Sequence, residues 1–331
     1  MQIRETTSNA GLLDPREQHL RIPSHHPGLS LFLRYLPSST SIAARGIVLY
    51  VHGATFPSAL SIAHRFDGHS WRDALCAAGF HVWGLDFLGY GHSDRYPEMD
   101  RPADAPEPLC RAEDGSRQIE AAVRAICQRH GVARISIIAH SWGTIATGRF
   151  AARCPDLVDR LVFFGAIARR NDSGDTPRYP AWRAVTLYEQ WQRFTAEVPH
   201  GEAPVLSRRH FDDWGERYLD SDPHSRRMQP AGVRTPGGPW YNIDRALHGD
   251  LEYDPVGVQA PVAIIRGDWD SLCTDADAAW LMRELRSSPV RRDVKIGRAT
   301  HLMHLEAGRY ALYREAESFL AGGDLPPHET C

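Results

Sequence analysis

The fold of this chain is decided by the stretch Ile135-Ser-Ile-Ile-Ala-His-Ser141-Trp-Gly-Thr144. Its apolar, β-branched run stops at Ser141, and small residues resume at once in a helix-forming pattern. This change of pattern predicts a buried strand, a sharp turn and a helix. A serine at such a turn has two interpretations. It caps the helix, or its hydroxyl stands exposed above the sheet edge as a nucleophile.

The residues around the turn match a nucleophile pattern at all but one position. Ala139, His140, Ser141, Trp142 and Gly143 fit G-x-S-x-G, with alanine in place of the first glycine. The turn needs little bulk there, so one methyl group is a mild departure. The expected helix begins at the turn with unpaired backbone N–H groups, which can hold a developing oxyanion.

Composition and charge narrow the classes of function. A net charge of −3 over 331 residues gives no indication of a nucleic acid or an anionic membrane as partner, so we expect a small-molecule partner. No segment approaches the roughly 18 apolar residues of a membrane helix, and the N-terminus has no apolar stretch behind its charge. We therefore expect a cytoplasmic protein, and the sequence leaves its oligomeric state open. The cysteines lack metal-ligand spacing and are interpreted as reduced thiols; they are Cys76, Cys110, Cys127, Cys154, Cys273 and Cys331.

Strands and helices alternate along the first half of the chain. Continuous apolar runs predict strands that are covered on both faces of a parallel sheet. We expect strands at 19–23, 29–36, 46–52, 80–85, 135–140 and 160–164. We expect helices at 70–79, 114–130 and 142–153. Residues up to about 17 are predicted to form a loose arm, and the proline-rich stretch 97–108 an irregular surface loop.

The alternation stops after Gly165. Residues 166–254 show no buried strand but a dense set of aromatic residues on expected helices, which indicates a helical cap packed over the sheet edge. The α/β pattern then resumes, with elements expected at 262–265, 275–286, 292–296 and up to about 320. The predicted organisation is a core of residues 1–165 and 255–331, with a cap of residues 166–254 inserted after the sixth strand.

Four candidate groups follow expected strands: the loop after His52, then Ser141, Asp270 and His301. Ligands of open α/β sheets lie at the carboxyl ends of the strands, so these groups are expected to converge. Their order, serine, aspartate and then histidine, is that of the α/β-hydrolases.

The sequence resembles an α/β-hydrolase with an inserted cap from about residue 46 to residue 320. The motifs that carry the resemblance are His52-Gly-Ala54, Asp86-x-x-Gly-x-Gly-x-Ser93, Ala139-His-Ser-Trp-Gly143, Gly267-Asp-Trp-Asp270 and Thr300-His301. The resemblance implies a mostly parallel central sheet flanked by helices. It also implies a catalytic triad of Ser141, His301 and Asp270, with oxyanion-binding N–H groups on Ala54 and Trp142. It requires no metal or organic cofactor.

Asp270 and His301 each have an alternative nearby in the sequence. Asp268 also follows the strand, but Asp270 fits the Gly-x-x-Asp spacing of the family. His304 lies one helical turn past His301 and is the alternative base. His140, next to the serine, is expected to pack inside the turn.

The cap offers candidates for substrate binding. The Ser-Trp-Gly elbow is locally similar to that of proline iminopeptidase-like enzymes, whose cap carboxylates receive a free amino terminus. Carboxylates that could do so are Glu189, Glu197 and Glu216, although surface ion pairs are the simpler interpretation. Arg169 and Arg170 could bind a substrate carboxylate or be paired structurally. The candidate substrate-contacting residues are Arg169, Trp182, Trp191, Trp214 and Trp240.

The sequence thus predicts a serine hydrolase that cleaves a carboxylic ester or thioester of a small molecule through an acyl-enzyme. One triad cleaves several bond types, so three alternatives stay open. The first is an aminopeptidase or amidase, and the second is acyl transfer or cyclisation on the same residues. The third is a binding protein that has lost the reaction, which would have no need of the intact triad.

Overall fold

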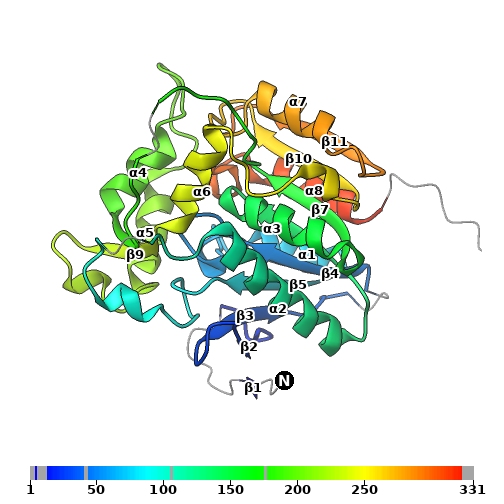
Figure 1. Ribbon diagram of the computed structural model, residues 1–331, viewed down its shortest axis with the longest axis horizontal. Coiled ribbons are helices and arrows are strands. Elements are labelled where there is room, and N and C mark those ends of the chain that lie inside the picture. The colour runs from blue at the N-terminus through cyan, green and yellow to red at the C-terminus, as the bar shows by residue number, and fades with distance from the viewer. Residues whose placement is uncertain (1–3, 6–12, 41–43, 105–106, 175–176, 323–331) are drawn as a thin grey trace, which may run out of the picture.

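The computed structural model describes residues 4–5, 13–40, 44–104, 107–174 and 177–322. Its centre is a nine-stranded sheet with the order β1-β2-β3-β5-β4-β6-β7-β10-β11 (Figure 1). The strands are β1 (Arg4–Glu5), β2 (Gln18–Pro23), β3 (Ser30–Leu36), β4 (Gly46–Val51), β5 (Phe80–Asp86), β6 (Ile135–His140), β7 (Val158–Phe164), β10 (Val262–Gly267) and β11 (Arg291–Ile296). From β5 to β11 all neighbours are parallel, whereas β1, β2 and β3 form an antiparallel edge. The predicted mostly parallel α/β-hydrolase sheet is confirmed.

Helices cover both faces of this sheet. They are α1 (Trp71–Ala77), α2 (Ala112–His130), α3 (Trp142–Arg153), α7 (Asp275–Glu284) and α8 (Arg309–Leu320). Successive side chains of β4 point to opposite faces, so Leu49 and Val51 pack in the cluster with α2 and α3, while Val48 and Tyr50 pack in the cluster with α1 and α8. The continuous apolar run of this strand is thereby explained, because both of its faces are buried.

The segment between β7 and β10 differs from the predicted all-helical cap. We call residues 166–254 the insert, which occupies the left of Figure 1. It contains β8 (Trp182–Thr186), α4 (Leu187–Thr195), α5 (Arg208–Asp220), β9 (Gly232–Pro236) and α6 (Gly238–Leu247). The expectation of no buried strand was wrong, because β8 and β9 pair antiparallel and β9 is buried throughout. These two short segments have no apolar run, and only their pairing across the insert makes them strands.

Helix α6 packs on the core helices α2 and α3. Its Asn242 carboxamide oxygen accepts hydrogen bonds from the Ala112 N–H (2.8 Å) and from the Trp142 indole N–H (3.1 Å). The last helix of the insert therefore supports the start of α2 and the helix that follows Ser141.

The end of the predicted loose arm is packed. Asp14 and Glu17 are buried. The Glu17 carboxylate accepts hydrogen bonds at 2.6 Å from both Arg34 of β3 and Arg72 of α1, and its Oε1 lies 2.6 Å from Nε2 of His19. Burial raises the pKa of Glu17, but its hydrogen bond to His19 and the charges of the guanidinium groups outweigh burial and lower the pKa to about 2. The prediction was wrong for these residues because the arginines that bind Glu17 lie 17 and 55 positions further along the chain.

Three further expectations concern the loop 97–108, the cysteines and membrane-spanning helices. The stretch 97–108 begins with a 3-10 helix, Pro97–Asp100, in which Met99 is buried, so it is only partly an irregular surface loop. The cysteines that the structure describes are all free, and Cys331 lies outside the described residues. Within the described residues, no helix combines the length and apolar character needed to span a bilayer.

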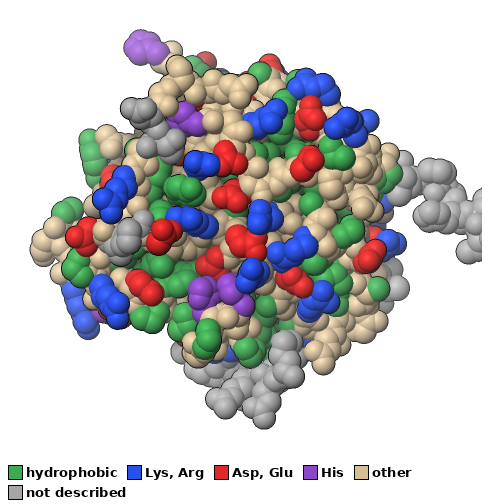
Figure 2. All heavy atoms as spheres, viewed as in Figure 1, with side chains coloured by type: hydrophobic (Ala, Val, Ile, Leu, Met, Phe, Trp, Pro, Cys, Tyr) green, Lys and Arg blue, Asp and Glu red, His purple; other side chains and the backbone are tan. Residues whose placement is uncertain are grey.

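Basic and acidic side chains are interspersed on the face that Figure 2 shows. Ion pairs between α2 and α3 contribute to this pattern, with Glu113 bound to Arg149 and Glu120 bound to Arg153 at 2.6 Å. Such exposed pairs contribute little to stability.

Candidate active site

Ser141 lies in the turn between β6 and α3. Its backbone has φ 55° and ψ −127°, a conformation that costs of order 1–3 kcal/mol for a residue other than glycine. The Ser141 N–H donates to the Phe164 carbonyl at 3.0 Å, which ties the turn to β7. A Cβ atom at Gly143 would lie 2.5 Å from the His52 carbonyl oxygen, so only glycine allows this approach to the loop after β4. Ala139 is fully buried within β6 in place of the first glycine of the motif.

Ser141, His301 and Asp270 form one hydrogen-bonded series. Nε2 of His301 lies 2.8 Å from Oγ of Ser141, and Nδ1 of His301 lies 2.9 Å from Oδ1 of Asp270. The same carboxylate oxygen accepts the N–H groups of Leu272 and Cys273, each at 2.9 Å, which fixes its orientation. All three side chains are buried. Burial lowers the pKa of His301, but the charge and the hydrogen bond of Asp270, together with the charge of Glu197, outweigh burial, so the pKa of His301 lies above its ordinary value.

The alternative acid and base, Asp268 and His304, lie outside this hydrogen-bonded series. Asp268 is exposed, and its carboxylate accepts the Ala299 N–H at 3.3 Å. His304 is buried beside the ring of Phe56, and within the described residues neither of its ring nitrogens has a hydrogen-bond partner. Burial lowers the pKa of His304 to about 3. His140 packs inside the turn and donates from Nε2 to the His301 carbonyl at 3.0 Å.

The loop after β4 carries the first predicted oxyanion donor, the Ala54 N–H. His52 is buried, and burial lowers its pKa to about 4, so the ring is neutral. Its Nδ1 donates to the Gly53 carbonyl at 2.8 Å, and its Nε2 accepts the Phe87 N–H at 3.1 Å. The carbonyl and the N–H of a trans peptide point in opposite directions, so the Ala54 N–H points away from the His52 ring. A Cβ atom at Gly53 would lie 3.1 Å from Cβ of Ser141, so this loop lies against the serine.

The second predicted oxyanion donor begins a helix. Trp142 is the first residue of α3, where backbone N–H groups have no partner within the helix. Its side chain is buried and packs closely on α2. A Cβ atom at Gly115 of that helix would lie only 2.9 Å from the indole. The indole thus anchors the helix while the backbone N–H stays next to Ser141.

The four candidate tryptophans of the insert lie in different surroundings. Trp214 is fully buried and donates to the Leu60 carbonyl at 2.9 Å, and Trp182 donates to the Arg101 carbonyl at 3.0 Å. Trp191 packs edge-on against another insert ring. Trp240 lies 5.1 Å, centroid to guanidinium, from Arg193 of α4. Through Arg193, which is hydrogen-bonded to Thr55, this contact reaches the loop after β4, and Trp214 reaches the same loop through its ring contact with Phe56.

The two candidate arginines at the start of the insert lie over α7. Arg170 forms an ion pair with Asp277 and donates to the Ser271 carbonyl at 2.8 Å, so it is paired structurally. Arg169 is exposed, with its guanidinium 5.3 Å from the ring centroid of Trp280.

Glu197, just after α4, joins the two loops that carry Asp270 and His301. Its Oε1 accepts the Ser271 N–H at 2.8 Å and the Ser271 hydroxyl, and its Oε2 accepts the His301 N–H at 2.7 Å. The sequence marked Glu197 only as a possible partner of an amino group. No sequence signal reveals these contacts, because they cross 74 and 104 positions of the chain.

Replacing Glu197 with glutamine is expected to lower kcat/KM by roughly 10-fold, because a charged acceptor for two backbone N–H groups is lost. The charged groups around His301 are Asp270, Glu197 and Arg193, and Glu197 raises the pKa of the imidazole. The acid limb of the pH profile should therefore move to lower pH in the variant. The control is Glu216→Gln, because Glu216 forms an exposed ion pair with Arg226. Equal profiles for the two variants would contradict a positioning role for Glu197.

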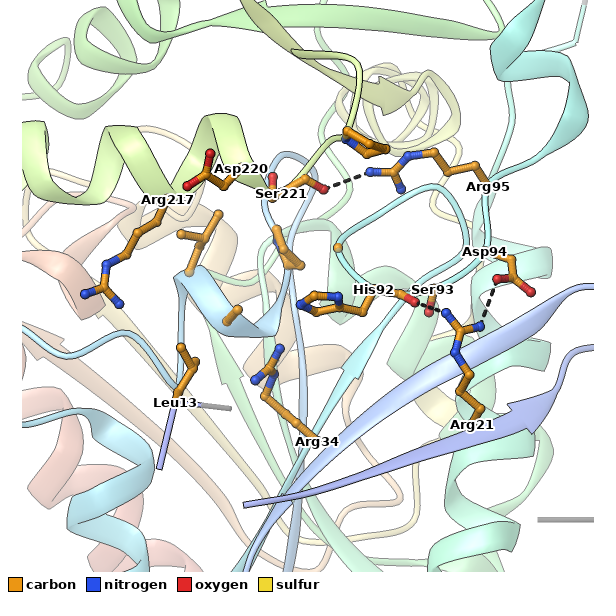
Figure 3. A pocket seen from close by; sticks show the side chains of 15 residues that line it. Leu13, Arg21, Arg34, His92, Ser93, Asp94, Arg95, Arg217, Asp220 and Ser221 are labelled. Carbon is orange, nitrogen blue, oxygen red and sulfur yellow. Dashed lines mark hydrogen bonds and ion pairs between the residues drawn. The ribbon is translucent and has the colours of Figure 1, made fainter. Parts of the chain in front are cut away.

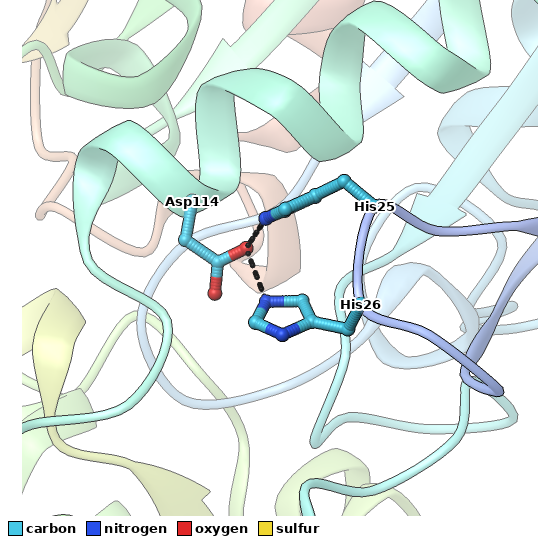
Figure 4. A group of neighbouring side chains, drawn as sticks. All are labelled: His25, His26 and Asp114. Carbon is cyan, nitrogen blue, oxygen red and sulfur yellow. Dashed lines mark hydrogen bonds and ion pairs between the residues drawn. The ribbon is translucent and has the colours of Figure 1, made fainter.

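One group of side chains has the arrangement of metal ligands (Figure 4). Nε2 of His25 and Nε2 of His26 both lie 3.1 Å from Oδ1 of Asp114, at the first turn of α2. Asp114 also accepts hydrogen bonds from Gln118 (2.9 Å) and from the Tyr96 hydroxyl. Hydrogen bonds alone account for this partly exposed cluster, which shares no residue with the predicted site.

A cavity of about 710 Å³ lies between the turn after β5 and the end of α5 (Figure 3). Several of its charged residues are already paired, as Arg21 with Asp94 at 2.8 Å and Arg34 with Glu17 at 2.6 Å. None of its lining residues belongs to the predicted catalytic set.

Several known proteins are similar to this chain. The chain is 25% identical over 300 residues to homoserine O-acetyltransferase of Deinococcus radiodurans, an alignment that covers 85% of this chain and 76% of that protein. Among solved structures it is similar to the thioesterase domain from the curacin biosynthetic pathway, with TM-score 0.59 and 14% identity over 92% of this chain and 99% of that one. It is also similar to the esterase EaEST of Exiguobacterium antarcticum, with TM-score 0.59 and 15% identity over 91% and 98% of the two chains. The sequence profile of the alpha/beta hydrolase fold matches residues 46–308, and the chain belongs to this family.

Proposed function

We propose that this protein is a serine hydrolase that cleaves a carboxylic ester or thioester of a small molecule. The observation that carries the proposal is the buried hydrogen-bonded series from Ser141 through His301 to Asp270 at the carboxyl end of the parallel strands. Esterase and thioesterase structures with the same fold support this class of chemistry by analogy.

In the proposed reaction, Oγ of Ser141 attacks the carbonyl carbon and its proton passes to Nε2 of His301. Asp270 accepts Nδ1–H and stabilises the imidazolium. The oxyanion binds the N–H groups of Ala54 and Trp142, each contributing on the order of 10²-fold to 10³-fold in rate. His301 then protonates the departing alcohol or thiol. A water molecule, deprotonated by His301, cleaves the acyl-enzyme and restores Ser141.

Acyl transfer is the second candidate, and the homoserine O-acetyltransferase relative favours it. An alcohol would replace water in the second half of the reaction, while every protein group keeps its role. Product analysis in the presence of an added alcohol separates the two: hydrolysis gives the acid, and transfer gives a new ester. The same analysis would reveal cyclisation of a substrate that carries its own hydroxyl.

An aminopeptidase has less support, because the three candidate carboxylates are engaged. Glu189 caps α4 through Thr186 and pairs with Arg183, and Glu216 pairs with Arg226. Glu197 already accepts three hydrogen bonds.

Turnover of aryl esters against prolyl and alanyl arylamides tests the proposed bond type. We expect the esters to be cleaved faster, because a phenol leaves more readily than an arylamine. Amide turnover that exceeds ester turnover would reject the ester proposal in favour of an amidase. Absence of turnover together with absence of labelling by a fluorophosphonate would indicate a binding protein.

A further inference from the structure

Arg193 reaches from α4 of the insert to the loop beside Ser141. Its Nη1 donates to Oγ1 of Thr55 at 2.7 Å, and Thr55 directly follows Ala54. The positive charge of Arg193 lowers the pKa of both His301 and His304, which lie at this end of the sheet. Arg193 is therefore bonded to the residue that follows Ala54, in the loop that lies against Ser141.

In the described part of the chain, Arg193 forms no ion pair with a carboxylate. The nearest candidate is Glu197, one helical turn further on, and its oxygens are occupied by Ser271 and the His301 N–H. Burial lowers the pKa of Arg193 to about 10, although the charge of Glu197 opposes this, so the guanidinium is still charged at neutral pH. A half-buried cation without a counter-ion is unfavourable, and an anionic ligand would relieve the cost.

Trp240 provides an unpartnered donor beside Arg193. Its ring lies against the Arg193 guanidinium, with the centroid 5.1 Å from the central carbon. Its indole N–H is buried and has no acceptor among the described residues. The donors of a guanidinium lie in one plane, which suits the two oxygens of a carboxylate, and contact with an aromatic ring restricts the orientation of that plane.

We propose that Arg193 and Trp240 bind a carboxylate of the substrate, so that the protein acts on esters or thioesters with a negatively charged group near the reacting carbonyl. The location of the reacting bond rests on the proposed function of Ser141. The opposite choice, a cationic substrate, would need an available carboxylate, and Glu189, Glu197 and Glu216 are all engaged.

Matched ester pairs test this proposal. One pair carries the carboxylate on the leaving group, 4-acetoxybenzoate against its methyl ester. The other carries it on the acyl group, 4-nitrophenyl hydrogen adipate against 4-nitrophenyl methyl adipate. We expect the wild type to prefer the anionic member of one pair. The pair that shows the preference indicates whether the substrate carboxylate belongs to the leaving group or to the acyl group. Arg193→Gln should reduce that preference in kcat/KM by roughly 10-fold to 100-fold, the size of a hydrogen bond to a charged group.

Two further variants separate charge recognition from support of the loop. Arg193→Lys keeps the charge and should recover part of the preference. Thr55→Val removes only the hydrogen bond to the loop and should leave the preference unchanged. Equal losses for anionic and neutral esters in Arg193→Gln, or cleavage of the anionic and neutral esters at equal rates by the wild type, would overturn the proposal.

Calorimetric binding of adipate to Ser141→Ala, with and without Arg193→Gln, provides a measurement that needs no turnover. Binding that depends on Arg193 supports the carboxylate site even if all four esters are inert, in which case the proposed hydrolase function fails alone. Equal binding to both proteins would overturn the carboxylate site and leave the hydrolase proposal standing.

Discussion

Replacing Ser141 with alanine is expected to abolish labelling by a fluorophosphonate probe and to lower kcat for an ester by roughly 10³-fold or more. Oγ of Ser141 lies 2.8 Å from Nε2 of His301, so its proton has an immediate acceptor. Alanine leaves the imidazole in place but removes the atom that forms the acyl-enzyme. The measurement is in-gel detection of the labelled protein together with steady-state kinetics.

The matched control is Ser136→Ala. Ser136 is buried in the same strand, β6, and its hydroxyl donates to Asp159 at 3.2 Å, away from the histidine. Labelling and turnover of this variant should equal those of the wild type. Full labelling of Ser141→Ala would contradict the assignment of the nucleophile, whatever the turnover.

Replacing His301 with alanine should be about as severe, because the series from serine to aspartate is broken at its centre, and we expect a loss of roughly 10³-fold or more. The pH profile of the wild type gives a second measurement. His301 must be neutral to accept the serine proton, and Asp270 holds its pKa above the ordinary value. Activity should therefore rise with pH through that raised pKa. In Asp270→Asn the acid limb should move to lower pH, while kcat falls.

His304→Ala is the control for His301→Ala. His304 is equally buried, but its contacts are with the rings of Phe56, His140 and Phe164. Its loss should be mild in kcat, and thermal unfolding checks that both variants are folded. A loss with His304→Ala as large as that with His301→Ala would contradict the choice of base.

One segment of the insert contacts both halves of the proposed site. Arg193 and Glu197 are four residues apart, and they bind the loop after β4 and the loops after β10 and β11 respectively. These contacts connect α4 to the loop of the proposed oxyanion donor Ala54 and to the loop of the proposed base His301. The insert is thereby in direct contact with both sides of the proposed site.

Most of the core followed from the sequence because its signals are local. The runs at β4 and β6 are apolar without alternation, as a strand buried on both faces requires. Ser70 and Gly131 stand at the ends of α1 and α2, where their capping geometry is found in the structure. The insert was harder to predict, because the strands β8 and β9 are weak by themselves and exist through their pairing.

The sequence by itself determined the α/β-hydrolase sheet and the meeting of Ser141, Asp270 and His301, because the carboxyl ends of parallel strands share one edge and each group directly follows such a strand. Only the tertiary structure decided which charges of the insert face that edge. Glu197 contacts residues 74 and 104 positions away, and Arg193 contacts one 138 positions away. Contacts over such separations depend on how the insert packs on the core, which no local pattern encodes. The stretch from Ile135 to Thr144 thus predicted the candidate nucleophile, while the contacts of Arg193 with the loop after β4 support the proposal of a negatively charged substrate.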